Sequence, residues 1–284
     1  MNQSPSVRCG VNSISAVISI SIVSFACRLL CSLTCSIACF ACTEGSAKSR
    51  SVSSAGAPSN PAEARGIPHT NQAVRGSIVV LGSSTAAGTG PKDPNNAWVW
   101  RYKATLARQF PNVTLVNLAI GGLSTFELQP TGYRPPPNRP APVEGNNITA
   151  ALALNPSAII VNLPSNDQAN NYPLAEQLAN YERIASLARS AQVLLWISTT
   201  QPRNFNDVTQ RESLTQARDA ITTRFAPRTL DFWTPFATTT GFIKASYNSG
   251  DDTHLNDEAH AVLAGIVEAA HIPQEIAGKS PPSP

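Results

Sequence analysis

The stretch "SIVVLGSSTAAG" (77–88) joins an apolar, β-branched run to one glycine and two serines. A nearly continuous apolar run is typical of a strand that is covered on both faces of a parallel sheet. Glycine and small hydroxyl residues then end the strand, where a side chain can reach the edge of the sheet. Most Gly-Ser-Ser sequences are only turns, so the rest of the chain must decide whether Ser83 or Ser84 does chemistry.

Strand-like and helical patterns alternate along the rest of the chain. The other predicted strands are 113–120, 157–163, 192–199 and, more weakly, 228–232. Helical periodicity is found in residues 97–110, 147–155, 173–191, 206–225 and 256–270. This alternation predicts a doubly wound α/β fold of the flavodoxin-like type, a three-layer α/β/α sandwich with a parallel five-stranded sheet.

The chain of 284 residues is expected to contain one folded domain, at residues 76–275. Residues 1–42 have the layout of a signal peptide or a lipoprotein signal, with a basic residue, short apolar stretches and small residues before a polar region. Residues 43–75 are rich in Ser, Ala and Pro and are predicted to be a disordered linker. Residues 276–284 are predicted to be a flexible tail.

The predicted signal implies export, to the periplasm or the cell exterior. "FAC" at 40–42 resembles the end of a bacterial lipobox, which would make Cys42 a lipidated residue and attach the protein to a membrane. The alternative is an apolar anchor that stays attached, against which the serines and Arg28 in this region argue.

Charge and cysteine usage exclude several classes of function. The formal net charge is only +3, which gives no indication of a nucleic-acid or polyanion partner. Every cysteine lies within the first 42 residues, and no spacing matches a zinc site with partner histidines. The domain is therefore expected to need no metal, no organic cofactor and no disulfide.

In a doubly wound sheet, ligands bind beyond the carboxyl ends of the strands, and Ser84 follows the first strand. A serine needs a base to accept its proton, and the usual base is a histidine oriented by a carboxylate. "GDDTHLND" (250–257) places Asp251 three residues before His254. The alternative is that Asp252 or Asn256 only caps the last helix and that His254 is a surface residue.

Two further strand ends carry groups that can stabilise a developing oxyanion. Gly122 follows the second strand, and its backbone N–H can approach a substrate closely. Asn166 follows the third strand and offers a side-chain amide. With the backbone N–H of Ser84, these groups are the predicted oxyanion site.

Four blocks of the chain, "LGSSTAAG", "NLAIGGLST", "LPSND" and "DDTHL", resemble the SGNH (GDSL-type) hydrolase family over residues 77 to about 270. The resemblance implies that Ser84 is the nucleophile, with His254 as base and Asp251 orienting it. It also implies that Asp167 helps to hold the loops around the nucleophile. The sequence departs from the family at Ser83, which stands where the family has aspartate, and at Pro164, which replaces a glycine.

The resemblance implies a serine esterase that forms an acyl-enzyme. The expected substrates are small or short-chain acyl esters, including acetyl groups on carbohydrates. The alternatives are an O-acyltransferase that uses the same triad and a non-catalytic binding domain.

Two features bear on a substrate subsite. A proline-rich segment (128–147) could shape one through Tyr133, Arg134 and Arg139, or it could be a stiff loop without substrate contact. Likewise, three of the tryptophans could stack on sugar rings or could only pack in the core. These candidates are Trp98, Trp100 and Trp233.

Overall fold

The computed structural model describes residues 74–279. The predicted signal (1–42) and nearly all of the predicted linker (43–75) therefore lie outside the described residues. Within 74–279 the strands are β1 (Gly76–Gly82), β2 (Val113–Asn117), β3 (Ala158–Asn162), β4 (Leu194–Ser198) and β5 (Thr229–Leu230). The α-helices are α1 (Ser84–Ala87), α2 (Trp98–Gln109), α3 (Ile148–Ala153), α4 (Asn166–Ala169), α5 (Leu174–Ser190), α6 (Val208–Phe225), α7 (Asp257–Ala269) and α8 (Ile272–Gly278).

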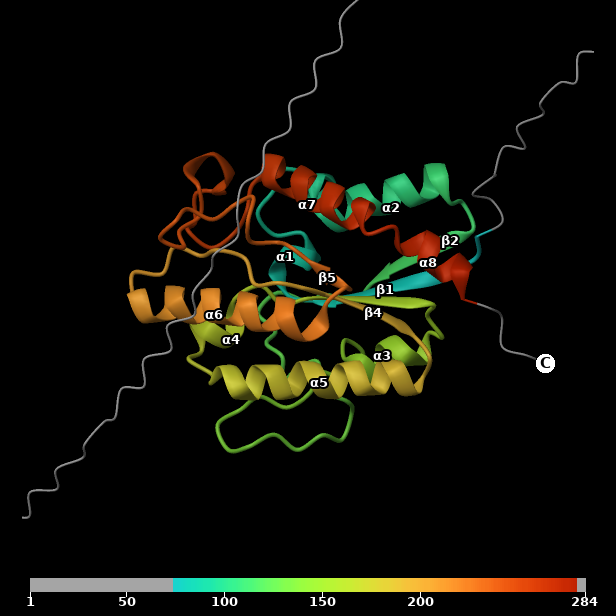
Figure 1. The fold of residues 1–284 in the computed structure, drawn as a ribbon, viewed down its shortest axis with the longest axis horizontal. Coiled ribbons are helices and arrows are strands. Elements are labelled where there is room, and N and C mark those ends of the chain that lie inside the picture. Colours follow the sequence, from blue (N-terminus) through green and yellow to red (C-terminus); the bar gives the residue numbers. More distant parts are fainter. Residues whose placement is uncertain (1–73, 280–284) are drawn as a thin grey trace, which may run out of the picture. The chain divides into compact units, whose positions relative to one another are not determined.

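The five strands form one parallel sheet in the order β2-β1-β3-β4-β5. Helices cover both of its faces, with α2, α7 and α8 on one side and α3, α5 and α6 on the other (Figure 1). This arrangement confirms the predicted flavodoxin-like α/β sandwich. Because the strands are parallel, their carboxyl ends all lie at the same edge of the sheet.

Strand β1 explains why its sequence is apolar without interruption. Ile78 and Val80 pack into the core under α2 and α7, whereas Val79 and Leu81 pack into the core under α3 and α5. Successive side chains of a strand point to opposite faces, so a strand that is covered on both sides needs an apolar residue at every position.

Several boundaries differ from those expected, and β3, β4 and β5 are each shorter than predicted. Strand β2 ends at Asn117 rather than at 120. The Asn117 side chain donates to the Ala86 carbonyl and accepts from the Ala119 N–H at this end of the strand. The predicted tail at 276–284 is wrong at its start. Helix α8 continues to Gly278, and Ile276 is buried in the core.

Within residues 74–279, no helix combines the length and the apolar character that crossing a membrane requires.

Candidate active site

Ser84 lies at the first position of α1, directly after the buried strand β1. The turn between them depends on Gly82, because a Cβ atom at this position would lie 2.5 Å from the Asn162 carbonyl oxygen. Ser83 is fully buried, whereas Ser84 is partly exposed. The turn therefore presents Ser84, and not Ser83, at the carboxyl edge of the sheet.

Ser84, His254 and Asp251 form one hydrogen-bonded chain. The His254 Nε2 atom lies 2.9 Å from Ser84 Oγ, and the His254 Nδ1 atom lies 2.6 Å from Asp251 Oδ2. A carboxylate only accepts hydrogen bonds, so Nδ1 carries the proton of the neutral ring. The lone pair of Nε2 then faces the Ser84 hydroxyl and can accept its proton.

The loop before α7 holds Asp251 in place. Its Oδ1 atom accepts from the backbone N–H groups of Thr253 and His254 and from the Ser249 hydroxyl. Partial burial acts to raise the pKa of Asp251, but the hydrogen bonds from the His254 ring and from these donors outweigh it. The pKa of Asp251 therefore lies well below its ordinary value, and the carboxylate stays ionised.

The nearby residues Asp252 and Asn256 have hydrogen-bond partners different from those of Asp251. Asp252 accepts hydrogen bonds from the side chains of Asn204 and Asn248 and makes none to His254. Asn256 caps α7 by accepting from the Ala259 N–H. The capping alternative is thus correct for Asn256, but it does not remove His254 from the site.

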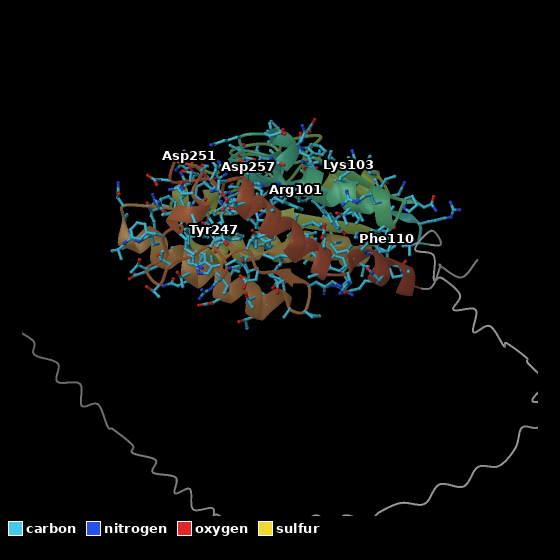
Figure 2. All side chains as sticks on the ribbon, turned by 90° about the horizontal axis from the view of Figure 1, so that it is seen from above. Arg101, Lys103, Phe110, Tyr247, Asp251 and Asp257 are labelled. Atoms are coloured by element: carbon cyan, nitrogen blue, oxygen red, sulfur yellow. The ribbon has the colours of Figure 1, made fainter. Side chains whose placement is uncertain are left out.

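The Asp251 end of the site is exposed to solvent. Figure 2 shows Asp251 at the periphery of the domain, on the same side as Asp257 at the start of α7. The Asp251 side chain is 51% exposed, and that of His254 is 17% exposed. Gly90 passes close beneath this loop, since a Cβ atom there would lie 2.1 Å from the Leu255 carbonyl oxygen.

The loop after β2 brings Gly122 close to Ser84, the candidate nucleophile. A Cβ atom on the neighbouring Gly121 would lie 3.9 Å from Ser84 Cβ, and the Ile120 N–H bonds to the Gly82 carbonyl. Gly122 has a φ of +89°, which favours glycine, and it is exposed. Within residues 74–279, the backbone N–H groups of Ser84 and Gly122 have no acceptor, so both are available to an oxyanion.

Asn166 also lies in the site, but both of its N–H bonds already have acceptors. Its Nδ2 atom donates to Ser83 Oγ at 2.7 Å and to the Leu123 carbonyl at 2.9 Å. The carbonyl can only accept, which fixes the orientation of the amide. An oxyanion at Asn166 would therefore have to take over or share one of these two hydrogen bonds.

Asp167 connects the loops after β2 and β3, in agreement with the expectation from the family. The Thr125 hydroxyl and backbone N–H donate to its carboxylate, at 2.6 and 3.1 Å. Asn180 on α5 donates to the same hydroxyl. Burial raises the pKa of Asp167 to about 6, although the hydrogen bonds from Thr125 work in the opposite direction.

Two polar residues after β4 support the site, although no role was predicted for them from the sequence. Gln201 accepts from the Thr85 hydroxyl and donates to the Thr253 carbonyl, which joins α1 to the loop that carries Asp251 and His254. Asn204 donates to the Asp252 carboxylate and accepts from the Ile243 N–H. Their position at a strand end was the only signal in the sequence, because their partners lie far away along the chain.

The proline-rich loop is occupied by contacts to α5, along whose outer side it runs (Figure 1). Arg139 pairs with Glu176 at 2.6 Å and stacks on Tyr172, while Arg183 of α5 stacks on Tyr133. These contacts favour the stiff-loop interpretation over a substrate subsite.

Of the three tryptophans that were candidates for stacking on sugar rings, two are core residues. Trp98 is buried edge-on against Phe232, and Trp233 is buried beneath Arg218. Trp100 is only partly buried, and Lys103 lies over its ring.

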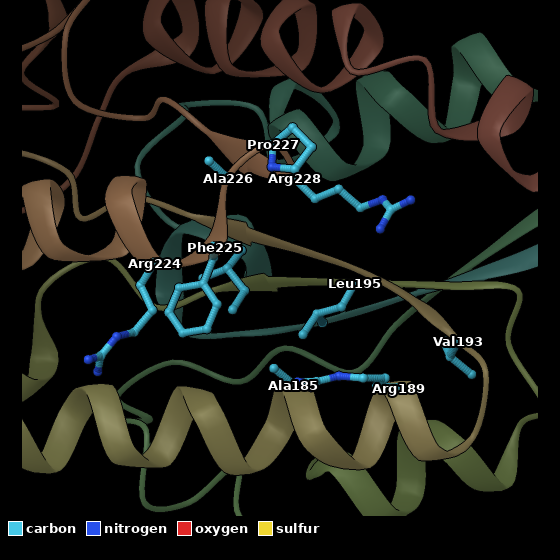
Figure 3. A pocket seen from close by; sticks show the side chains of 10 residues that line it. Ala185, Arg189, Val193, Leu195, Arg224, Phe225, Ala226, Pro227 and Arg228 are labelled. Atoms are coloured by element: carbon cyan, nitrogen blue, oxygen red, sulfur yellow. The ribbon is translucent and has the colours of Figure 1, made fainter.

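A separate cavity lies away from this site. It has a volume of 370 Å³ and is lined by residues of α5, β4 and the end of α6, including Val193, Leu195 and Phe225 (Figure 3). None of the triad residues line it.

Comparison with known proteins identifies the family. The model of the GDSL-like lipase/acylhydrolase family matches residues 80–262. The esterase EstA from Pseudoalteromonas sp. has a similar structure, with a TM-score of 0.50 and 15% identity over 72% of this chain and 99% of EstA. A mutant of Axe2, an acetyl-xylooligosaccharide esterase from Geobacillus, gives a TM-score of 0.52 and 15% identity over 69% of this chain and 93% of Axe2. No curated protein matches. The family model spans well over half of the sequence, so the chain belongs to the GDSL-like lipase/acylhydrolase family and is a serine esterase.

Proposed function

We propose that the protein hydrolyses short-chain acyl esters, and acetyl groups on carbohydrates in particular, through Ser84, His254 and Asp251. The observation that carries this proposal is the continuous hydrogen-bonded chain from the Ser84 hydroxyl through the imidazole to the carboxylate. A hydroxyl, a neutral imidazole and an ionised carboxylate in this order make a nucleophile, a base and an orienting group.

The reaction has two steps. Ser84 Oγ attacks the ester carbonyl carbon while His254 Nε2 takes the hydroxyl proton, and the imidazolium then gives this proton to the leaving alcohol. A water molecule attacks the resulting acyl-serine, again giving its proton to His254. The acid leaves as that proton returns to Ser84 Oγ.

The backbone N–H groups of Ser84 and Gly122 hold the carbonyl oxygen as it becomes negative. The Asn166 amide is the third donor, and it joins them by exchanging its bond to Ser83 Oγ for one to the oxyanion. Asp251 keeps its charge throughout and stabilises the imidazolium that forms at His254.

The position of the triad near the surface, with Asp251 exposed, supports an ester that projects from a larger, water-soluble molecule. A long acyl chain would need an extended apolar surface next to Ser84, whereas an acetyl group needs little space. Axe2, whose fold is similar, is an acetyl-xylooligosaccharide esterase. These two observations favour acetylated carbohydrate over lipid.

A panel of p-nitrophenyl esters of increasing acyl length, together with acetylated xylo- and manno-oligosaccharides, tests the proposal. We expect kcat/KM to be highest for acetate and to fall steadily with chain length, and acetate to be released from the oligosaccharides. Ser84→Ala is the matched control and should be inactive on all of them. Preference for long chains would refute the assignment, and products formed only with an added acceptor alcohol would identify an acyltransferase.

We also propose that the protein is exported. The support is the signal-like sequence of residues 1–42 and the restriction of all cysteines to that segment. Fractionation of cells that express the full chain would test it, and Cys42→Ala would release the protein from the membrane fraction if this residue is lipidated. Finding the chain in the cytoplasm at its full length would contradict export.

A further inference from the structure

Arg203 lies beside the candidate active site, in the loop that follows β4. Its Nη1 atom is 3.5 Å from the hydroxyl of Ser165, the residue before Asn166. The negative charge of Asp251 also acts on its guanidinium. Arg203 therefore lies near both the loop that carries Asn166 and the loop that carries Asp251 and His254.

The guanidinium of Arg203 is half-buried and lacks an acidic partner. Within residues 74–279 it makes no ion pair, and its only hydrogen bond is the long one to Ser165. Asp251 cannot become its partner without leaving His254, to which it is bonded at 2.6 Å. By contrast, Arg139 and Arg228 are each paired with a glutamate.

A partly buried cation without a partner loses hydration and gains little in return. Burial accordingly lowers the pKa of Arg203, and the attraction of Asp251 only partly opposes this effect. The guanidinium carbon also lies 4.7 Å from the centre of the Phe205 ring, in a cation–π contact. Within residues 74–279, most of the five N–H donors of this cation therefore have no acceptor.

The geometry points to a subsite for an anionic group: we propose that Arg203 binds a carboxylate carried by the ester substrate, as in an acetylated sugar acid. This inference rests on the proposed esterase function and narrows its substrate class. The planar guanidinium can bind a carboxylate through two parallel hydrogen bonds. Without it, the charges of Asp251 and Asp252 would repel an anionic substrate.

Matched pairs of esters that differ only in this charge test the proposal. The first pair, 4-acetoxybenzoate and its methyl ester, carries the carboxylate in the alcohol half. The second, the p-nitrophenyl monoester of succinate and its methyl ester, carries it in the acyl half. For each pair, the ratio of kcat/KM for the anionic ester to that for the neutral ester is measured in wild type, Arg203→Gln, Arg203→Lys and the control Arg224→Gln. Arg224 lies on α6 and lines the separate cavity, so its substitution removes the same charge away from the triad.

Comparing this ratio between variants cancels the intrinsic reactivity of the esters. We expect Arg203→Gln to lower it by about ten- to a hundredfold for one of the two pairs, the scale of a hydrogen-bonded charge pair. Arg203→Lys keeps the charge but not the planar fork, so it should lie between wild type and Arg203→Gln. The pair that responds identifies the half of the substrate that faces Arg203.

An unchanged ratio for both pairs in Arg203→Gln would overturn the inference, as would an equal change in Arg224→Gln. Should Arg203→Gln fail to fold, Arg203→Lys decides in the same way. If wild type hydrolyses none of the four esters, the esterase proposal fails first. If the neutral esters are hydrolysed but the ratio does not depend on Arg203, only the anionic subsite is overturned.

Discussion

Replacing His260 by asparagine should change how the stability of the domain depends on pH. His260 is fully buried on α7, and its Nδ1 atom accepts a hydrogen bond from the Trp98 N–H at the start of α2. Burial lowers the pKa of His260 to about 4, from an ordinary value of 6.5. Arg101 and His254 act in the same direction, whereas Asp257 and the Thr89 backbone oppose the shift.

The direction in which stability changes with pH follows from the protonation states of His260 in the folded and unfolded chain. Between pH 6.5 and 4 the unfolded chain gains a proton at His260 while the folded chain does not. The free energy of unfolding therefore falls as the pH falls through this range. At about 1.4 kcal/mol per pH unit, the loss amounts to roughly 3 kcal/mol. Asparagine keeps an acceptor for the Trp98 N–H but does not titrate, so the variant should lack this loss.

Urea unfolding of wild type and His260→Asn at pH 7 and at pH 4.5 measures the effect. The variant loses the volume of the ring and should be less stable at pH 7. This deficit should shrink by about 2–3 kcal/mol at pH 4.5. Asp167→Asn is a control, for which the change in stability with pH should have the opposite sign. The reason is that burial raises the pKa of Asp167 to about 6 from 3.8. The contribution of Asp167 to stability is therefore greatest below pH 3.8 and is lost as the pH rises to about 6.

The same deficit at both pH values would refute the reasoning, because His260 would then titrate as it does in the unfolded chain. A chemical-shift titration of the His260 ring gives the same answer directly. A midpoint near 6.5 in the folded protein would also contradict the assignment of a buried neutral imidazole.

The remaining predictions concern the site. A fluorophosphonate should label Ser84, and Ser84→Ala should remove the label; mapping of the label to another residue would exclude this nucleophile. Asp251→Asn should lower kcat by roughly 10²–10⁴-fold, whereas Asp252→Asn, which does not contact His254, should lower it far less; the reverse order would exclude Asp251 as the orienting group. Asn166→Ala should lower kcat by about 10²–10³-fold with little change in KM, and a raised KM with kcat intact would make it a substrate-binding residue instead. Activity of the cysteine-free domain should be the same with and without dithiothreitol or a chelator, as measured with p-nitrophenyl acetate.

The parts of the fold that could be predicted are those with a strong local pattern. Strand β1 is apolar at every position because both of its faces are covered, and this requirement is visible in the sequence. Strand β5 pairs over only two residues, Thr229 and Leu230, so its length had no local signal. Helix α8 was missed because Ile276 is buried by contacts with the distant core.

In the candidate site too, the residues with a local sequence pattern could be predicted and those defined by long-range contacts could not. Ser84 could be predicted as a candidate because it follows a strand of a parallel sheet, and His254 because it lies shortly before the last predicted helix, three residues after Asp251. The partners of Gln201 and Asn204 could not be predicted, because each side chain connects segments that meet only in the folded protein. Local pattern thus located the proposed reacting groups, whereas only the tertiary structure shows which side chains hold their loops.

The proposed oxyanion role of Asn166 requires that an amide that is already hydrogen-bonded can still favour the transition state. In the free protein the amide donates to the neutral hydroxyl of Ser83, where the family has an aspartate. The carbonyl oxygen of a bound ester is also neutral and gains little by displacing that hydroxyl. The oxyanion of the tetrahedral intermediate carries a full charge, and hydrogen bonds to charged acceptors are roughly twice as strong. The exchange therefore becomes favourable only as the charge develops, so the amide should contribute to kcat rather than to substrate binding.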